Sequence, residues 1–124
     1  MKQALLVFLG GGLGSMLRYL ISKVLRFHFP DVYAGTLLVN LVGSLILGFL
    51  WGMALKNRLV SENQLLFFAT GLCGGFTTFS TFAFEQHELF KQGQMLHLTL
   101  YLAATLVFGV LLVALGFWLG KSLS

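Results

Sequence analysis

Residues 71–82 read GLCGGFTTFSTF, a run in which a glycine pair and four hydroxyl side chains, with Phe79 and Phe82 three residues apart, interrupt an apolar stretch. The run holds no charge and no proline, so its chemistry must come from backbone groups, hydroxyls and ring edges. Each glycine costs a helix up to about 1 kcal/mol relative to alanine, and neighbouring hydroxyls can bond to freed backbone groups. The run therefore predicts a helix that opens at Gly74 and Gly75.

A helix break within a membrane is tolerated only where it is buried in protein or lines a watery cavity. Carbonyl groups at such a break can coordinate a small cation, as unwound segments do in transporters. Phe79 and Phe82, three residues apart, project from one helix face, and a phenyl ring carries a positive edge. Two phenylalanines on a helix are usually core packing, but beside a break their edges can also face a small anion.

The composition places the whole chain in a bilayer. Of its 124 residues, 57% are hydrophobic and 10% are charged, against about 45–50% and about 25% in soluble domains. At about 20 residues per spanning helix, we predict one all-α domain over residues 1–124 with four spans, at about residues 3–25, 35–55, 64–84 and 95–120. The apolar N-terminus has no clear cleavage site, so it is read as a retained helix rather than a signal peptide. The basic residues are scattered, which gives no indication of nucleic-acid binding.

The basic residues near the span ends favour one orientation of the chain in the membrane over the other only slightly. If the N-terminus is inside, the inner side carries Lys2, Lys56, Arg58 and Lys121, and the outer side carries Lys23, Arg26 and Lys91. A Lys/Arg excess orients membrane helices, and this excess is small. The sequence is therefore consistent with insertion in both orientations and with an antiparallel dimer. Ser61, in the loop KNRLVSEN, is the expected N-cap of the third span.

Small residues recur at four-residue spacing in three spans. The pairs are Gly10 with Gly14, Gly48 with Gly52, and Gly116 with Gly120. Such pairs let helix backbones approach closely where lipid provides no hydrophobic driving force. We expect them at helix contacts. Because four thin helices enclose little polar volume, a dimer with a pathway between its subunits is the natural inference.

Polar residues form one stripe on each of two spans. The stripe on the second span is Thr36, Asn40 and Ser44, and the stripe on the fourth is His97, Tyr101 and Thr105. A four-residue spacing places each stripe on one helix face. Intramembrane polar groups mark sites, although such groups also serve only to hold helices together. Neither span contains a carboxylate, so a cation pathway built on acid rings is disfavoured. Arg18 either adds positive charge within the first span or lies at the membrane interface. Glu85 follows the hydroxyl run and either joins the anion path or lies at the membrane interface.

Three segments together resemble the CrcB/Fluc family of fluoride channels: GGGLGSMLRYL (residues 10–20), TLLVNLVGSLILGFL (36–50) and GLCGGFTTFSTF. The resemblance covers the whole chain in length, span number and motif order, and it narrows "small anion" to fluoride. It implies an antiparallel, dual-topology homodimer in the bacterial inner membrane, with two pores that release cytoplasmic fluoride passively. Its partners would be fluoride and membrane lipid.

The resemblance also assigns residues. Phe79 and Phe82 would supply ring edges, and Asn40 would donate its amide to the ion. The accompanying polar track would comprise Thr36, Ser80, Thr81, Glu85 and Tyr101, and Arg18 matches an arginine of the family. The carbonyl groups of Gly74 and Thr77, from both subunits, would hold a central sodium ion.

Three other function classes remain to be weighed. A proton-coupled small multidrug exporter has similar length and topology, but it needs a membrane-embedded carboxylate, and the first span offers Arg18 instead. A non-transporting membrane subunit would leave the stripes and the motif unexplained. An enzyme is least favoured, since no nucleophile and base are paired and the three histidines lie in separate segments.

Overall fold

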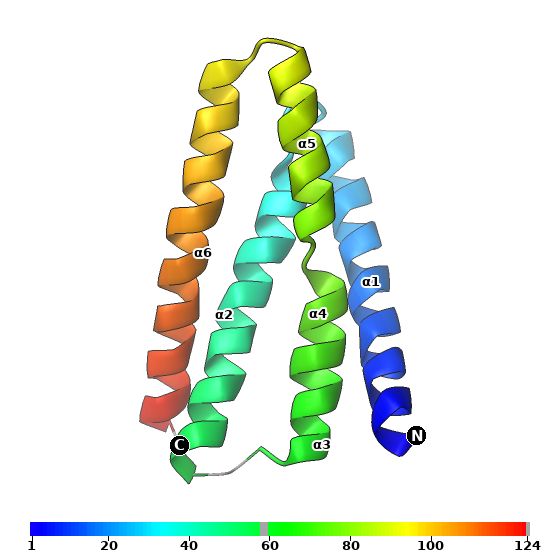
Figure 1. The fold of residues 1–124 in the computed structure, drawn as a ribbon, viewed down its shortest axis with the longest axis vertical. Coiled ribbons are helices and arrows are strands. Elements are labelled where there is room, and N and C mark those ends of the chain that lie inside the picture. The colour runs from blue at the N-terminus through cyan, green and yellow to red at the C-terminus, as the bar shows by residue number, and fades with distance from the viewer. Residues whose placement is uncertain (58–59, 124) are drawn as a thin grey trace.

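The regular structure of the described chain is entirely helical. The computed structural model describes residues 1–57 and 60–123, so that Arg58 and Leu59 of the predicted polar loop lie outside it. In chain order, the elements are α1 (Lys2–His28), α2 (Ala34–Asn57), α3 (Glu62–Leu65), the π-helical segment η1 (Leu66–Cys73), α4 (Gly74–Phe76), α5 (Phe79–Lys91) and α6 (Met95–Leu123). The elements run along one long axis, and the start of α1 and the end of α6 lie at the same end of the molecule (Figure 1).

Four segments of the described chain are long and apolar enough to cross a membrane: Lys2–His28, Ala34–Leu55, Glu62–Lys91 and Met95–Leu123. This confirms the predicted all-α fold with four membrane-capable helices. The third segment continues to Lys91, well past its expected end near residue 84. It can do so because the first carboxylate beyond that point, Glu85, is buried and hydrogen-bonded by other helices.

The helices pack as two pairs, α2 along α6 and α1 along the η1–α4 segment. The small-residue pairs lie at these contacts. A Cβ atom on Gly14 would overlap the Leu72 carbonyl oxygen, and one on Gly48 would overlap the Val113 carbonyl oxygen. The expected close helix contacts are therefore confirmed, and they are contacts within one chain.

The third segment begins with a complete capping box. The Ser61 hydroxyl accepts from the Gln64 amide at 3.2 Å, and the Gln64 side chain accepts from the Ser61 amide at 2.8 Å. The predicted cap at Ser61 is thus confirmed. Such caps satisfy two of the amide groups that the first turn of a helix leaves unpaired.

The backbone leaves the helix at Thr77 and Thr78, which have extended conformations (φ −93°, ψ 158° and φ −153°, ψ 121°) between α4 and α5. Figure 1 shows this link as a short non-helical stretch. The prediction that Gly74 and Gly75 open the helix is wrong, since both are helical. A Cβ atom on Gly75 would overlap the Gly11 carbonyl oxygen, so that glycine lets α1 approach instead.

Candidate functional site

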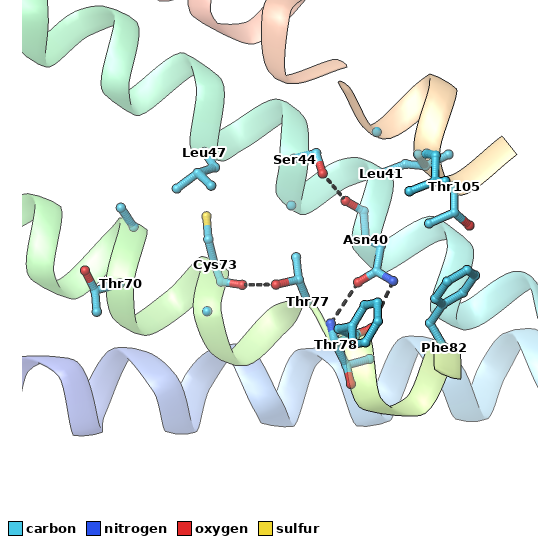
Figure 2. Close-up of a pocket in the computed structure, with 16 residues that line it drawn as sticks. Asn40, Leu41, Ser44, Leu47, Thr70, Cys73, Thr77, Thr78, Phe82 and Thr105 are labelled. Carbon is cyan, nitrogen blue, oxygen red and sulfur yellow. Dashed lines mark hydrogen bonds between the residues drawn. The ribbon is translucent and has the colours of Figure 1, made fainter. Parts of the chain in front are cut away.

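A cavity of about 410 Å³ lies beside the interruption between α4 and α5 (Figure 2). Five residues predicted from the sequence line it, namely Asn40, Gly74, Thr77, Phe79 and Phe82. Ser44 and Thr105, one from each polar stripe, line it as well. The interruption, both phenylalanines and parts of both stripes therefore meet at one place, which we call the central cavity.

Asn40 holds the interruption in place from α2. Its Nδ2 donates to the Thr78 carbonyl oxygen at 3.1 Å, and its Oδ1 accepts from the Thr78 amide at 2.8 Å. Figure 2 shows both bonds. An amide side chain has two donor hydrogens, so the bond to Thr78 leaves one N–H for another acceptor. The predicted donation of Asn40 to an ion is limited to that second N–H.

Two backbone carbonyl oxygens at the interruption lose their helical donors. In a continuous helix, the Thr78 amide would bond to the Gly74 oxygen and the Thr81 amide to the Thr77 oxygen. Here the Thr78 amide donates to Asn40, and the Thr81 amide donates to the Thr78 hydroxyl at 3.2 Å. The Gly74 and Thr77 oxygens are released from the helical pattern by these substitutions.

The aromatic rings form a continuous row beside the central cavity. The Phe79 and Phe82 ring centroids are 6.1 Å apart, and Phe82 meets Tyr101 edge-on at 4.9 Å and 83°. Tyr33 stacks on Tyr101 at 6.0 Å. Phe82 is 5% exposed, whereas Phe79 is 78% exposed. One ring is thus fixed inside the chain, and the other faces outward.

The Glu85 carboxylate is buried and bonded by two hydroxyl groups. Thr36 Oγ1 donates to Oε2 at 2.9 Å, and the Tyr101 hydroxyl donates to Oε1 at 2.8 Å. The three residues come from α2, α5 and α6, and each is less than a tenth exposed. Glu85 therefore belongs to a buried polar cluster of the protein rather than to its exposed surface.

A second polar pocket, of about 220 Å³, borders this cluster at Thr36 and Glu85. It brings together four predicted residues, Arg18, Thr36, Thr81 and Glu85. Arg18 Nε donates to the Gly75 carbonyl oxygen at 3.0 Å, so Arg18 connects α1 to α4 rather than only lying at the interface. We call this the arginine pocket.

The arginine pocket also contains Arg26 and Tyr33, which sequence reasoning did not assign to the site. Tyr33 lies outside the spanning segments, and its pKa is raised by burial and then by the negative charges of Glu85 and Glu88. Its hydroxyl is therefore a neutral donor at ordinary pH. The proximity of Arg26 to Glu85 depends on how α1 packs, for which sequence spacing gives no signal.

Ser80 is the predicted site residue that the structure leaves apart. It is exposed, lines neither pocket, and has its hydroxyl 3.4 Å from that of Thr78. Thr78, which the sequence assignment left out, lines the central cavity and bonds to Asn40. A threonine three residues before Thr81 is a recognisable N-cap signal. Thr105 presents a buried hydroxyl without a hydrogen-bond partner in the described chain, and that hydroxyl lies at the central cavity.

No group of three or more histidine, cysteine, aspartate or glutamate side chains that could hold a metal ion occurs among the residues described. Side-chain metal sites of the transition-metal type use such groups. Any cation held in the described chain would depend on other oxygen atoms, such as the released carbonyls.

Comparison with known proteins gives a consistent result over nearly the whole chain. The family model described as "CrcB-like protein, Camphor Resistance (CrcB)" matches residues 5–117. A protein of Azobacteroides pseudotrichonymphae named "Fluoride-specific ion channel FluC" is 42% identical, with 94% of each chain covered. Proteins of the same name from Pyrococcus abyssi (41% identical, 98% of each chain) and Aquifex aeolicus (42% identical, 94% of this chain and 95% of the relative) are equally similar.

Proposed function

Because the chain belongs to the CrcB family, whose similar members are named fluoride-specific channels, we propose that it is a fluoride-selective channel. It would release cytoplasmic fluoride passively and reduce fluoride toxicity. The observation that carries the proposal is the convergence of Asn40, Phe79 and Phe82 at the interruption between α4 and α5. As a channel in the cell membrane, the protein would not be an enzyme.

The proposed path runs from the arginine pocket to the central cavity. Fluoride would enter where Arg18 supplies positive charge and the Thr81 hydroxyl, which accepts from Thr78, keeps its own hydrogen to donate. Thr36 borders the same pocket, but its hydroxyl donates to Glu85. It would then pass the Tyr101 ring to the edges of Phe82 and Phe79. Tyr101 touches both regions, since its hydroxyl bonds to Glu85 and its ring meets Phe82.

Selectivity would come from the kind of group that replaces water. Fluoride is small and strongly hydrated, so a selective path must offer donors in place of water and still release the ion. Hydroxyls, one remaining Asn40 N–H and positive ring edges are such groups. Because these groups carry only partial positive charge, unlike Arg18 at the entrance, they would hold the ion weakly enough for conduction.

The interruption offers two ends of opposite polarity. The carboxyl end of the η1–α4 segment and the amino end of α5 meet at Thr77 and Thr78. Helix carboxyl ends carry partial negative charge and amino ends partial positive charge. A cation at the released carbonyls and an anion near the start of α5 are therefore both favoured. The two residues follow the midpoint of the span Glu62–Lys91, which supports a break in the middle of the membrane.

The Gly74 and Thr77 carbonyl oxygens fit the sodium site that the family resemblance implies. They are the oxygens whose helical donors turn elsewhere, and open space lies where a Gly74 side chain would be. Oxygen ligands suit hard cations. Sodium would supply positive charge between two subunits. The chain itself keeps the Gly74 and Thr77 carbonyl oxygens free of amide donors, so that they could bind the ion.

An antiparallel homodimer would complete each pore. The Phe79 ring is 78% exposed in one chain, so it can line a path only with a second surface opposite. The small excess of basic residues on one side supports dual topology. Together these features support two pores, each lined by both subunits.

Passive exit agrees with the chemistry of the ion. Hydrogen fluoride crosses membranes as a neutral acid and dissociates at cytoplasmic pH. A negative interior then drives the anion outward by about 2.3 kcal/mol per charge per 100 mV. No proton coupling is needed, unlike the exporter alternative, for which the buried Glu85 carboxylate would have to exchange protons.

Growth under fluoride tests the proposal in cells. Bacteria that lack their own fluoride exporter are expected to grow in fluoride when they express this chain, and to remain sensitive when they express the Phe82→Ile variant at equal level. Failure of the well-expressed wild-type chain to protect would contradict the proposal. Fluoride release from liposomes that requires an imposed proton gradient would favour the exporter.

A further inference from the structure

The last turns of α1 form a groove of about 600 Å³, which shares Tyr19, Ser22 and Arg26 with the arginine pocket and otherwise lies outside the proposed fluoride path. Its lining includes Tyr19, Lys23, Val24, Arg26, Phe27 and His28, and contains no acidic residue. We propose that this groove, called the α1 basic groove, binds the headgroup phosphate of an anionic phospholipid.

The helix length places the groove at the membrane surface. At about 1.5 Å per residue, Lys2 and Lys23 are about 32 Å apart along α1, which matches a hydrocarbon core of about 30 Å. With Lys2 at one boundary, Lys23 lies at the other, and Arg26 and His28 lie beyond it among the headgroups. The Tyr19 ring then lies just below that boundary, the level at which aromatic residues are enriched.

The groups in the groove match the two parts of a lipid. Arg26 is attracted by the Glu85 charge but makes no hydrogen bond or ion pair with a residue of the described chain. Its N–H groups are therefore available to a phosphate, which a guanidinium can bind with two parallel N–H groups. Lys23 Nζ lies 6.0 Å from the Tyr19 ring centroid, which keeps the ammonium beside the groove. Val24 and Phe27 are 56% and 83% exposed, and give an acyl chain apolar contact.

Charge favours lipid over a second copy of the chain as the occupant. A second copy offers little opposite charge, because the chain has eight basic and only four acidic residues, and Glu85 is buried within its own chain. The nearest acidic residue in sequence, Asp31, does not line the groove. A lipid phosphate supplies the opposite charge, and basic residues next to a span attract anionic lipid by about 1 kcal/mol each.

Native mass spectrometry tests the assignment directly. Protein released from bilayers of phosphatidylglycerol and phosphatidylcholine is expected to retain phosphatidylglycerol preferentially. The Lys23→Gln/Arg26→Gln variant should lose this retention by about fivefold for each charge removed, which follows from about 1 kcal/mol per residue. Lys23→Arg should retain the lipid. Lys2→Gln, at the other end of α1, is the matched control and should behave as wild type.

Equal phosphatidylglycerol retention by the double variant and the wild type would overturn the assignment, and so would wild-type protein without preference between the two lipids. A double variant that instead dissociates to monomers in phosphatidylcholine would show that the groove is an interface between copies. Each readout is a bound mass, so the test does not depend on whether the protein conducts fluoride.

Discussion

The Asn40 side chain forms hydrogen bonds with both backbone groups of Thr78. It accepts from the Thr78 amide at 2.8 Å and donates to the Thr78 carbonyl oxygen at 3.1 Å, in place of bonds within a helix. Without this amide, both Thr78 backbone groups would be left unpaired in an apolar segment. One side chain of α2 thereby fixes the point at which the third segment changes from α4 to α5.

We expect Asn40→Ala to lower the stability of the fold by about 1–3 kcal/mol, since it leaves buried backbone groups unsatisfied, and to abolish fluoride flux. Thermal unfolding in detergent and flux from liposomes measure the two effects. Thr99→Ala is the control, because the Thr99 hydroxyl is exposed and bonds only to the Met95 carbonyl of its own helix. An Asn40→Ala protein with wild-type flux would contradict the role given to this residue.

Substitution of Phe79 or Phe82 should reduce fluoride flux without disrupting the dimer. Phe79→Ala removes an exposed ring, and Phe82→Ile keeps apolar bulk while removing the ring edge. Both should cut fluoride flux while the dimer still elutes as wild type on a sizing column. Phe84→Ala, an exposed ring of the same helix that lines neither pocket, should conduct normally. Unchanged flux in both pore variants would remove the ring-edge role.

Two glycines of α1 should respond in opposite ways to alanine. A Cβ atom on Gly14 would overlap the Leu72 carbonyl oxygen, whereas one on Gly12 meets nothing within 4 Å. Gly14→Ala should cost about 1–3 kcal/mol through overpacking, while Gly12→Ala should gain up to about 1 kcal/mol of helix propensity. Thermal stability of the two purified variants gives the comparison. Equal stability of the two would show that α1 and the η1–α4 segment do not pack this closely.

Sodium removal should destabilise the dimer if the Gly74 and Thr77 carbonyl groups hold the ion. Exchanging sodium for a large organic cation is expected to lower the unfolding temperature by several degrees, and added sodium should restore it. Thr77→Val removes the hydroxyl that bonds to the Cys73 carbonyl and keeps the Thr77 carbonyl, so it should retain the sodium response. An unfolding temperature indifferent to sodium would exclude the site.

The sequence was sufficient for features that depend on one helix at a time. Apolar length predicts the four membrane-capable helices, Ser61 predicts a cap that forms, and glycine spacing predicts the faces at which helices touch. In each case a local pattern alone determines the outcome, because the property belongs to a single turn or a single helix face.

Features that depend on contacts between helices could not be predicted in this way. The glycine pair looked like the weakest point of the third span, yet Gly75 is needed for the approach of Gly11, and the helix ends at Thr77 because Asn40 offers bonds to Thr78. Glu85 lies just past the apolar run, and only the arrival of Thr36 and Tyr101 from other helices makes its burial possible.

Fluoride efflux from liposomes is the most direct test of the central claim. Purified protein should release trapped fluoride, read with an ion-selective electrode, once a potassium ionophore allows charge balance, and should release no chloride under the same conditions. Absence of fluoride release, or chloride release at the same rate, would contradict the account.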